Sequence, residues 1–148
     1  MKGVIFIGLQ ASGKSTFFMK RFSKTHLRLS MDMLKTRFRE NILLTACLEA
    51  KQPCVIDNTN PTKADRIKYI KSFKDYRFEV IGYYFNSNLN ECLVRNSLRT
   101  GKELVPEIGV RAIHKKLEIP EYSEGFDYLF HVSIHGDDFL IKELADEF

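Results

Sequence analysis

The sequence is poor in cysteine and lacks several features that would mark a secreted or membrane protein. Its 148 residues include three cysteines, scattered and odd in number, which argues against a disulfide framework. No apolar run approaches the roughly 20 residues that cross a bilayer, and the first residues lack a cleavable signal pattern. Internal repeats, low-complexity tracts and linkers are also absent. We therefore expect one soluble, cytoplasmic domain covering residues 1–148, without membrane association.

The net charge of +4 is modest, but the charges are unevenly placed. Between Lys20 and Arg39 seven lysines and arginines accompany a single acid, whereas residues 121–148 carry eight acids and one lysine. A basic half favours an anionic partner such as a nucleotide or a nucleic acid. A solvated helix face would account for the same charges, so this feature alone leaves both interpretations open.

Apolar strand-like segments alternate with helical periodicity along the chain. We expect strands at residues 2–7, 26–30, 53–57, 78–85 and 126–134. We expect helices at 13–23, at 32–51, from an N-cap at Asn60, at 88–99, at 105–116 and at 137–148. Strands separated by helices indicate βαβ units. The expected class is therefore α/β, a three-layer sandwich of about five parallel strands with helices on both faces.

The stretch GLQASGKST at residues 8–16 fits the phosphate-binding pattern G-x-x-x-x-G-K-[ST] through Gly8, Gly13, Lys14 and Ser15. Glycines let the backbone wrap phosphate oxygens, and the helix that begins there adds the positive end of its dipole. Lys14 supplies a cation to the β- and γ-phosphates, and the Ser15 hydroxyl suits Mg²⁺. Because a buried strand precedes the loop and an amphipathic helix follows it, we expect a nucleoside triphosphate site.

Two carboxylates follow expected strands, Asp32 after HLRLS and Asp57 after CVI. Ligands of an open parallel sheet gather at the carboxyl ends of its strands, so both acids should lie near the phosphates. Asp57 suits the metal side, although it could instead build an Asx turn with Asn58. Asp32 suits a general base that accepts the proton of an attacking hydroxyl, and it could also serve as the N-cap of the long helix.

Arg95 and Arg99 lie four residues apart, on one face of an expected helix. Arginines placed there could close over the nucleotide and neutralise the charge that develops during phosphoryl transfer. A solvated helix face is the alternative. We assign a small helical lid to about residues 95–118.

Several motifs together resemble the kinase module of the polynucleotide 5′-kinase family, found in phage and animal polynucleotide kinase/phosphatases. They are GLQASGKSTF, LSMD, VIDNTNPTKADR, RNSLR and VPEIGVRAIHKKLEIPEYSEGF, between about residues 2 and 130. The resemblance implies ATP- and Mg²⁺-dependent phosphorylation of the 5′-hydroxyl ends of DNA or RNA. It also implies a role in nucleic-acid repair, with a ligase or a phosphatase as a possible partner enzyme.

The resemblance assigns roles by position. Asp32 would be the base, with Lys14 and Arg99 as the other catalytic groups. Ser15 and Asp57 would hold the metal. The nucleotide would contact Gly8, Ala11, Ser12, Gly13, Lys14, Ser15, Thr16, Arg95 and Arg99. The acceptor would contact Asp32, Lys35, Asn58, Asn60 and Arg66.

The chain departs from the family in two places. Lys35 stands where phage-type enzymes carry an arginine that holds the acceptor phosphate, and lysine lacks a bidentate fork; Arg37 or Arg39 could compensate. No D-x-D-G-T segment is present, so we expect a kinase without its own phosphatase domain. A kinase of a small metabolite or of a tRNA-linked hydroxyl, or a slow ATPase switch, remains the alternative, and the oligomeric state stays open.

Overall fold

A computed structural model describes residues 1–145 of the chain. Its elements are β1 (Lys2–Ile7), α1 (Lys14–Arg21), β2 (Leu27–Leu29), α2 (Met31–Leu34), α3 (Arg37–Ala50), β3 (Cys54–Ile56), α4 (Lys63–Asp75), β4 (Glu79–Phe85), α5 (Leu89–Ser97), the 3₁₀ turn η1 (Gly101–Glu103), α6 (Glu107–Lys116), the 3₁₀ turn η2 (Tyr122–Glu124), β5 (Tyr128–His135) and β6 (Asp138–Glu143).

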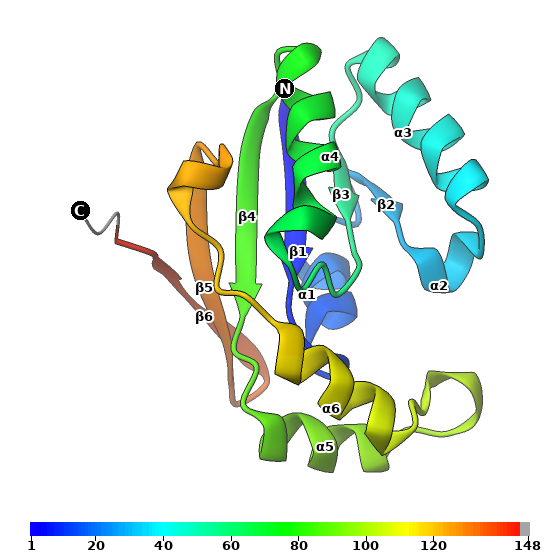
Figure 1. Ribbon diagram of the computed structural model, residues 1–148, viewed down its shortest axis with the longest axis vertical. Helices are drawn as coiled ribbons and strands as arrows, with labels where there is room; N and C mark the ends of the chain where they lie inside the picture. Colours follow the sequence, from blue (N-terminus) through cyan, green and yellow to red (C-terminus); the bar gives the residue numbers. More distant parts are fainter. Residues whose placement is uncertain (146–148) are drawn as a thin grey trace.

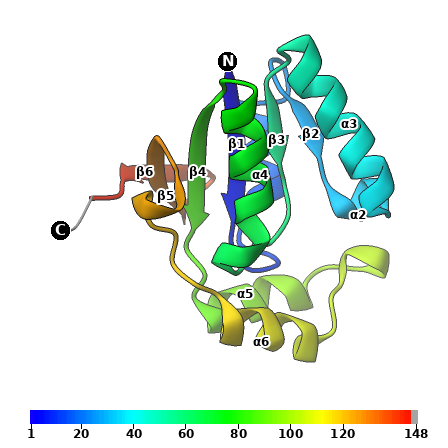
Figure 2. The same ribbon diagram turned by 45° about the horizontal axis from the view of Figure 1, so that its top comes forward.

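One mixed sheet forms the centre of the molecule, with strand order β2-β3-β1-β4-β5-β6. The first five strands are parallel and β6 is antiparallel to β5. The carboxyl ends of the parallel strands therefore meet at one edge of the sheet, where α5 and α6 lie (Figure 1 and Figure 2). The expected α/β architecture is confirmed, with a sixth strand added.

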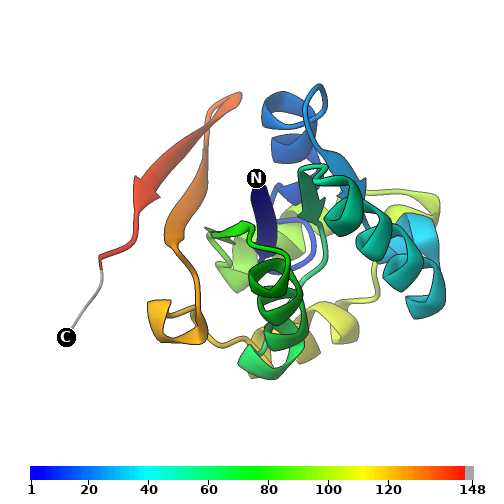
Figure 3. The same ribbon diagram turned by 90° about the horizontal axis from the view of Figure 1, so that it is seen from above.

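Two apolar cores lie on opposite faces of the sheet. On one face α3 and α4 bury side chains such as Leu44, Tyr69 and Phe73 against the strands. On the other face Phe17 and Phe18 of α1 pack against the strands. Viewed from above, α4 and α1 lie on opposite sides of the sheet, and the β5–β6 hairpin curves toward the side of α1 (Figure 3). The three-layer arrangement follows from strands that are apolar on both faces.

The expected closing helix over residues 137–148 is wrong for the part that the structure describes. Residues 138–143 form β6, which pairs with β5 through a two-residue turn at Gly136 and Asp137. Gly136 takes φ 62°, a left-handed conformation that glycine adopts without strain. Alternation explains the strand, because Phe139 and Ile141 pack on the α1 core. Residues 146–148 of that expectation lie outside the described residues.

Two other expectations also need correction. The long helix at 32–51 is split into α2 and α3 by Lys35, which takes φ 72°, and Thr36 caps α3 by accepting a hydrogen bond from the backbone of Arg39 at 3.2 Å. The N-cap of α4 is Thr62 rather than Asn60. Its hydroxyl and the carboxylate of Asp65 form a reciprocal capping box. Within residues 1–145, no helix has the length and apolar character needed to cross a membrane.

Candidate active site

The loop between β1 and α1 has the form of an anion nest. Gly13 caps α1 with φ 102°, and no side chain caps the helix there. The first backbone N–H groups of α1 therefore have no partner within the helix. The Ser12 hydroxyl oxygen beside them is buried, with no hydrogen-bond partner in the described part of the chain. These unsatisfied groups suit the oxygens of a phosphate chain.

Lys14 folds back over the loop. Its Nζ donates hydrogen bonds to the carbonyl oxygens of Gly8 at 2.9 Å and Leu9 at 2.6 Å. The pKa of Lys14 is lowered to about 8, mainly by burial; the charge of Asp57 opposes the shift, that of Arg99 contributes to it and that of Asp32 opposes it. Of the two predicted carboxylates, Asp57 is connected to the phosphate loop through Arg28, which also contacts Ser15.

Asp57, directly after β3, is tied to a residue that the sequence motifs did not single out. Its side chain is only 3% exposed, and its Oδ2 accepts a hydrogen bond from Nε of Arg28 in β2 at 2.7 Å. The Nη2 of Arg28 also donates to the Ser15 hydroxyl at 2.9 Å. Ser15 and Asp57, the two predicted metal ligands, therefore lie on either side of one guanidinium.

Asp32 lies in the first turn of α2 and is exposed. The N-cap of α2 is Ser30, so the alternative prediction that Asp32 is a helix N-cap is wrong. Asn58 fixes the start of this helix, since its Oδ1 accepts a hydrogen bond from the backbone N–H of Met31 at 2.9 Å. The alternative for Asp57 and Asn58 is an Asx turn with no role at the site. In the structure the side chain of Asn58 binds the start of α2.

A buried carboxylate organises the side chains beneath α2. Glu40 of α3 has no exposed surface and accepts hydrogen bonds from three side chains. The donors are Nη1 of Arg37 at 3.0 and 3.2 Å, the hydroxyl of Tyr69 at 2.9 Å and Nδ2 of Asn58 at 3.2 Å. Burial raises the pKa of Tyr69, and the neighbouring Glu40 charge adds to the effect. The network connects α3, α4 and the loop that holds α2.

Two residues predicted to contact the acceptor are buried in the structure. Arg66 is fully buried, pairs with both oxygens of Glu124 at 2.8 and 3.1 Å, and donates to the carbonyl oxygens of Asn60, Pro61 and Glu118. Asn60 is 4% exposed, and its side chain donates to the carbonyl of Phe6 in β1 at 2.8 Å. Their donors are engaged by the protein, and the contact of either residue with an acceptor stays a prediction.

The two lid arginines line a cavity beside the phosphate loop. Nε of Arg95 donates to the carbonyl oxygen of Ala11 at 2.7 Å, and Nη1 of Arg99 lies 3.4 Å from the carbonyl oxygen of Glu103. The cavity has a volume of about 330 Å³. Its lining residues are Ala11, Gly13, Thr16, Arg95, Arg99, Ile134, Gly136, Asp137, Asp138 and Phe139. The β5–β6 hairpin thus faces the lid across the loop, with apolar and cationic walls that suit a nucleoside.

The hairpin wall is fastened to α1. Lys20 donates a hydrogen bond to the carbonyl oxygen of Asp137, and Nη2 of Arg21 lies 3.4 Å from a carboxylate oxygen of Asp138. Phe139 packs edge-on against Phe17, with ring centroids 5.1 Å apart. Sequence reasoning missed this wall because it expected a helix there, although Gly136–Asp137 between two alternating segments is a hairpin signal.

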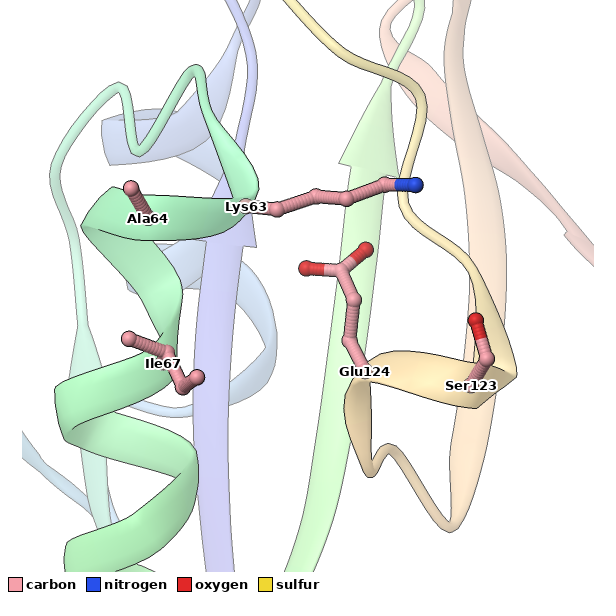
Figure 4. Close-up of a pocket in the computed structure, with 5 residues that line it drawn as sticks. All are labelled: Lys63, Ala64, Ile67, Ser123 and Glu124. Carbon is pink, nitrogen blue, oxygen red and sulfur yellow. The ribbon is translucent and has the colours of Figure 1, made fainter.

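A second cavity, of about 300 Å³, lies between the start of α4 and η2 (Figure 4). Both charged side chains that line it are paired within the protein, Lys63 with Glu121 at 2.9 Å and Glu124 with Arg66 at 2.8 Å. The remaining lining residues are Ala64, Ile67 and Ser123. The predicted site residues do not line this cavity, and its charges are already neutralised.

No group of three or more His, Cys, Asp or Glu side chains in residues 1–145 is arranged to hold a metal ion. The hydroxyl of Ser15 and the carboxylate of Asp57 are nevertheless the hard oxygen donors that Mg²⁺ prefers. Mg²⁺ commonly takes only one or two protein ligands and completes its shell with phosphate and water. The donor set fits a magnesium–nucleotide complex rather than a metal held by protein alone.

Two curated relatives match most of the chain. A bifunctional polynucleotide phosphatase/kinase of Schizosaccharomyces pombe is 26% identical over 129 residues, 83% of this chain and 31% of the relative. A protein of Acanthamoeba polyphaga mimivirus, whose name gives the same two activities provisionally, is 25% identical over 148 residues, 95% of this chain and 35% of the relative. The chain thus spans about a third of the length of each relative.

Solved structures share the fold at low sequence identity. Kti12 of Chaetomium thermophilum, in complex with ADP-AlF3, has a TM-score of 0.69 and 16% identity, covering 92% of this chain and 90% of Kti12. A gluconokinase of Sinorhizobium meliloti has a TM-score of 0.64 and 17% identity, covering 89% of this chain and 82% of the enzyme. The model of the family described as AAA domain matches residues 4–120. The chain belongs to this AAA domain family, and its fold is that of the P-loop kinases.

Proposed function

We propose that the chain is an ATP-dependent kinase that transfers the γ-phosphoryl group of ATP to the 5′-hydroxyl of a DNA or RNA end. The observation that carries the proposal is the position of Asp32, which is exposed in the first turn of α2, a helix whose start is held by Asn58, the residue next to Asp57. A solvent-facing carboxylate beside a triphosphate loop is suited to accept the proton of an acceptor hydroxyl.

In the proposed reaction the acceptor hydroxyl gives its proton to Asp32. Its oxygen forms a bond to the γ-phosphorus as the bond to the bridging oxygen breaks, and ADP leaves. Lys14 and the loop N–H groups would hold the β- and γ-phosphates, and Arg99 with Arg95 would neutralise charge on the transferring group.

Ser15 and Asp57 would hold Mg²⁺ in this site. The ion would neutralise charge on the phosphate oxygens, which is the chemistry that it supplies in phosphoryl transfer. Arg28 contacts both residues in the structure.

The surface around α2 and the start of α3 supports a polyanionic acceptor. We call it the acceptor surface: Met33, Lys35, Arg37, Phe38 and Arg39. Phe38 is 74% exposed and Met33 is 57% exposed, with the basic side chains interleaved between them in the sequence. Apolar side chains beside cations suit a strand whose bases stack while its phosphates pair with the charges. The strained φ of 72° at Lys35 turns the chain sharply within this surface.

The curated relatives add support from sequence, because both are named for polynucleotide phosphatase and kinase activities. A phosphatase or ligase working on the same ends would be the natural partner. A small-metabolite or tRNA-linked hydroxyl is the second candidate acceptor, since the shared fold also serves a gluconokinase. Salt would separate them: phosphate contacts release counterions, so polynucleotide affinity falls steeply with ionic strength.

The direct experiment is transfer of label from γ-labelled ATP, with Mg²⁺, to short 5′-hydroxyl DNA and RNA oligonucleotides. We expect transfer by the wild type, a loss of about 10²–10⁴-fold in Asp32→Asn, and a loss in Lys14→Ala. Asp75→Asn, an exposed acid at the far end of α4, is the matched control and should keep full activity.

ATP binding without transfer to either oligonucleotide would contradict the proposed acceptor. An ATPase rate that rises on addition of a small alcohol would then favour a metabolite kinase. A rate indifferent to every acceptor would favour a nucleotide-dependent switch.

A further inference from the structure

Arg28 reaches from β2 to the two side chains assigned to the metal. Its Nε donates to Oδ2 of Asp57 at 2.7 Å and its Nη2 donates to Oγ of Ser15 at 2.9 Å. The guanidinium carbon lies 5.9 Å from the ring centroid of Phe18. One planar cation therefore joins β2, the end of β3 and the first turn of α1.

The position of this cation has an electrostatic reason. Asp57 is 3% exposed, and an ionised carboxylate at that depth requires a compensating charge. The guanidinium supplies it through a short, charge-assisted hydrogen bond. Arg28 itself is 28% exposed, so its charged end has access to solvent along one side.

Oδ2 of Asp57 and Oγ of Ser15 accept hydrogen bonds from Arg28, and a metal ion would need lone pairs of the same two residues. The hydrogen bond from Nη2 occupies electron density on Ser15 Oγ that a metal ligand would need. A divalent ion beside Asp57 would also stand next to a guanidinium of like charge. Binding of one cation therefore opposes binding of the other.

We propose that Arg28 is an internal counter-cation that competes with Mg²⁺ for Ser15 and Asp57. In this arrangement the guanidinium of Arg28 compensates the negative charge of Asp57 until a metal–nucleotide complex binds. Binding of the metal is then coupled to release of the guanidinium toward solvent. The cost of that release lowers the affinity of the site for the metal. The inference rests on the proposed nucleotide-dependent function, but its test measures metal binding rather than phosphoryl transfer, so that each can fail separately.

The test is binding of Mn²⁺, as a paramagnetic probe, to the ADP complex of the full chain, measured by electron paramagnetic resonance. In Arg28→Gln we expect Mn²⁺ to bind about tenfold more tightly or better, the factor expected for removal of one hydrogen bond to a charged group. Arg77→Gln, which removes an equal charge at an exposed residue after α4, away from the cavity walls, should change the affinity less than about twofold.

A double-variant cycle isolates the competition. In an Asp57→Asn background Arg28 has lost its charged partner, so Arg28→Gln should give little further gain in Mn²⁺ affinity. An Arg28→Gln variant that binds Mn²⁺ as weakly as the wild type, or more weakly, would overturn the proposal. So would an equal gain in Arg77→Gln, which would indicate a general effect of net charge.

A second measurement needs no folded variant at this position. In wild-type protein labelled with ¹⁵N-arginine, the Nε–H of Arg28 should be protected from exchange with water when only ADP is present. Adding Mg²⁺ should shift this resonance and speed its exchange, because the bond to Asp57 is released. An Arg28 signal unchanged by Mg²⁺ at saturating ADP would show that no displacement occurs.

Discussion

Truncation of Glu40 to alanine should be one of the most damaging single changes in this protein. The carboxylate has no exposed surface and accepts from Arg37, Asn58 and Tyr69. Glu40→Ala removes the acceptor of the Tyr69 hydroxyl, which belongs to a residue only 2% exposed, at a cost of about 1–3 kcal/mol. The Asn58 amide loses a partner and the removed side chain leaves a cavity, whereas Arg37, with a side chain 56% exposed, can turn to water.

The total loss in free energy of unfolding is expected to be about 3–5 kcal/mol, the usual cost of removing one partner from a buried charged network. Urea unfolding followed by circular dichroism measures it. Glu49→Ala, the same change at an exposed position of the same helix, should stay within about 0.5 kcal/mol of wild type. A loss below about 1 kcal/mol in Glu40→Ala would refute the view that this network holds α3 against α4.

Three further predictions concern other parts of the structure. Arg66→Ala leaves the carboxylate of Glu124 buried and unpaired, so the free energy of unfolding should fall by about 3–5 kcal/mol in urea unfolding; a loss under 1 kcal/mol would contradict the buried pair. Burial and then Lys142 lower the pKa of His131, so the unfolded state takes up the proton first as pH falls below about 6.5. The melting temperature should therefore drop between pH 7.5 and 5.5, and by less in His131→Asn; an equal drop in both would exclude His131 as the cause. Phe38→Ala should raise KM for a 5′-hydroxyl oligonucleotide about 5- to 100-fold, since stacking contributes about 1–3 kcal/mol per base, with ATP affinity and melting temperature unchanged; an unchanged KM would remove Phe38 from the acceptor surface.

The central fold was predictable because its signals are local. The run of apolar residues in β1, the glycine-rich loop and the helical periodicity of α1 lie next to one another in the sequence, and together they predict a strand, a phosphate loop and a helix. Parallel strands then bring Asp32 and Asp57 to the same edge by topology alone. In the structure Asp57 follows β3 directly, and Asp32 lies in α2, whose first N–H is bound by the neighbouring Asn58.

The misplaced elements had local signals that periodicity outweighed. Apolar content over residues 137–148 reads as a helix, but Gly136–Asp137 after an alternating segment is a tight hairpin turn. Likewise, Thr62 followed by Asp65 is a capping box, and it overrides the apparent cap at Asn60.

The buried polar contacts had no comparable signal. Tyr69 is 29 residues from Glu40, and Glu124 is 58 residues from Arg66. Only tertiary packing brings these pairs together, so no sequence signal indicates that Arg66 is buried in an ion pair; its place at the acceptor comes from the family resemblance. Arg28 shows the same limit, because nothing in the segment HLRLS indicates that its third residue reaches across to β3.

The hairpin that walls the lid cavity has a kinetic consequence. The cavity joins residues 11–16, 95–99 and 134–139, so it exists only while β6 is paired and docked on α1. A strand at the edge of a sheet is paired on one side only, so it opens more often than the central strands. A nucleotide resting on Phe139 and Gly136 could then leave by undocking of the hairpin, without any movement of the phosphate loop. The residence time of the nucleotide would then be set by how often β6 detaches from α1. Product release would be fast even though the phosphate loop is rigid.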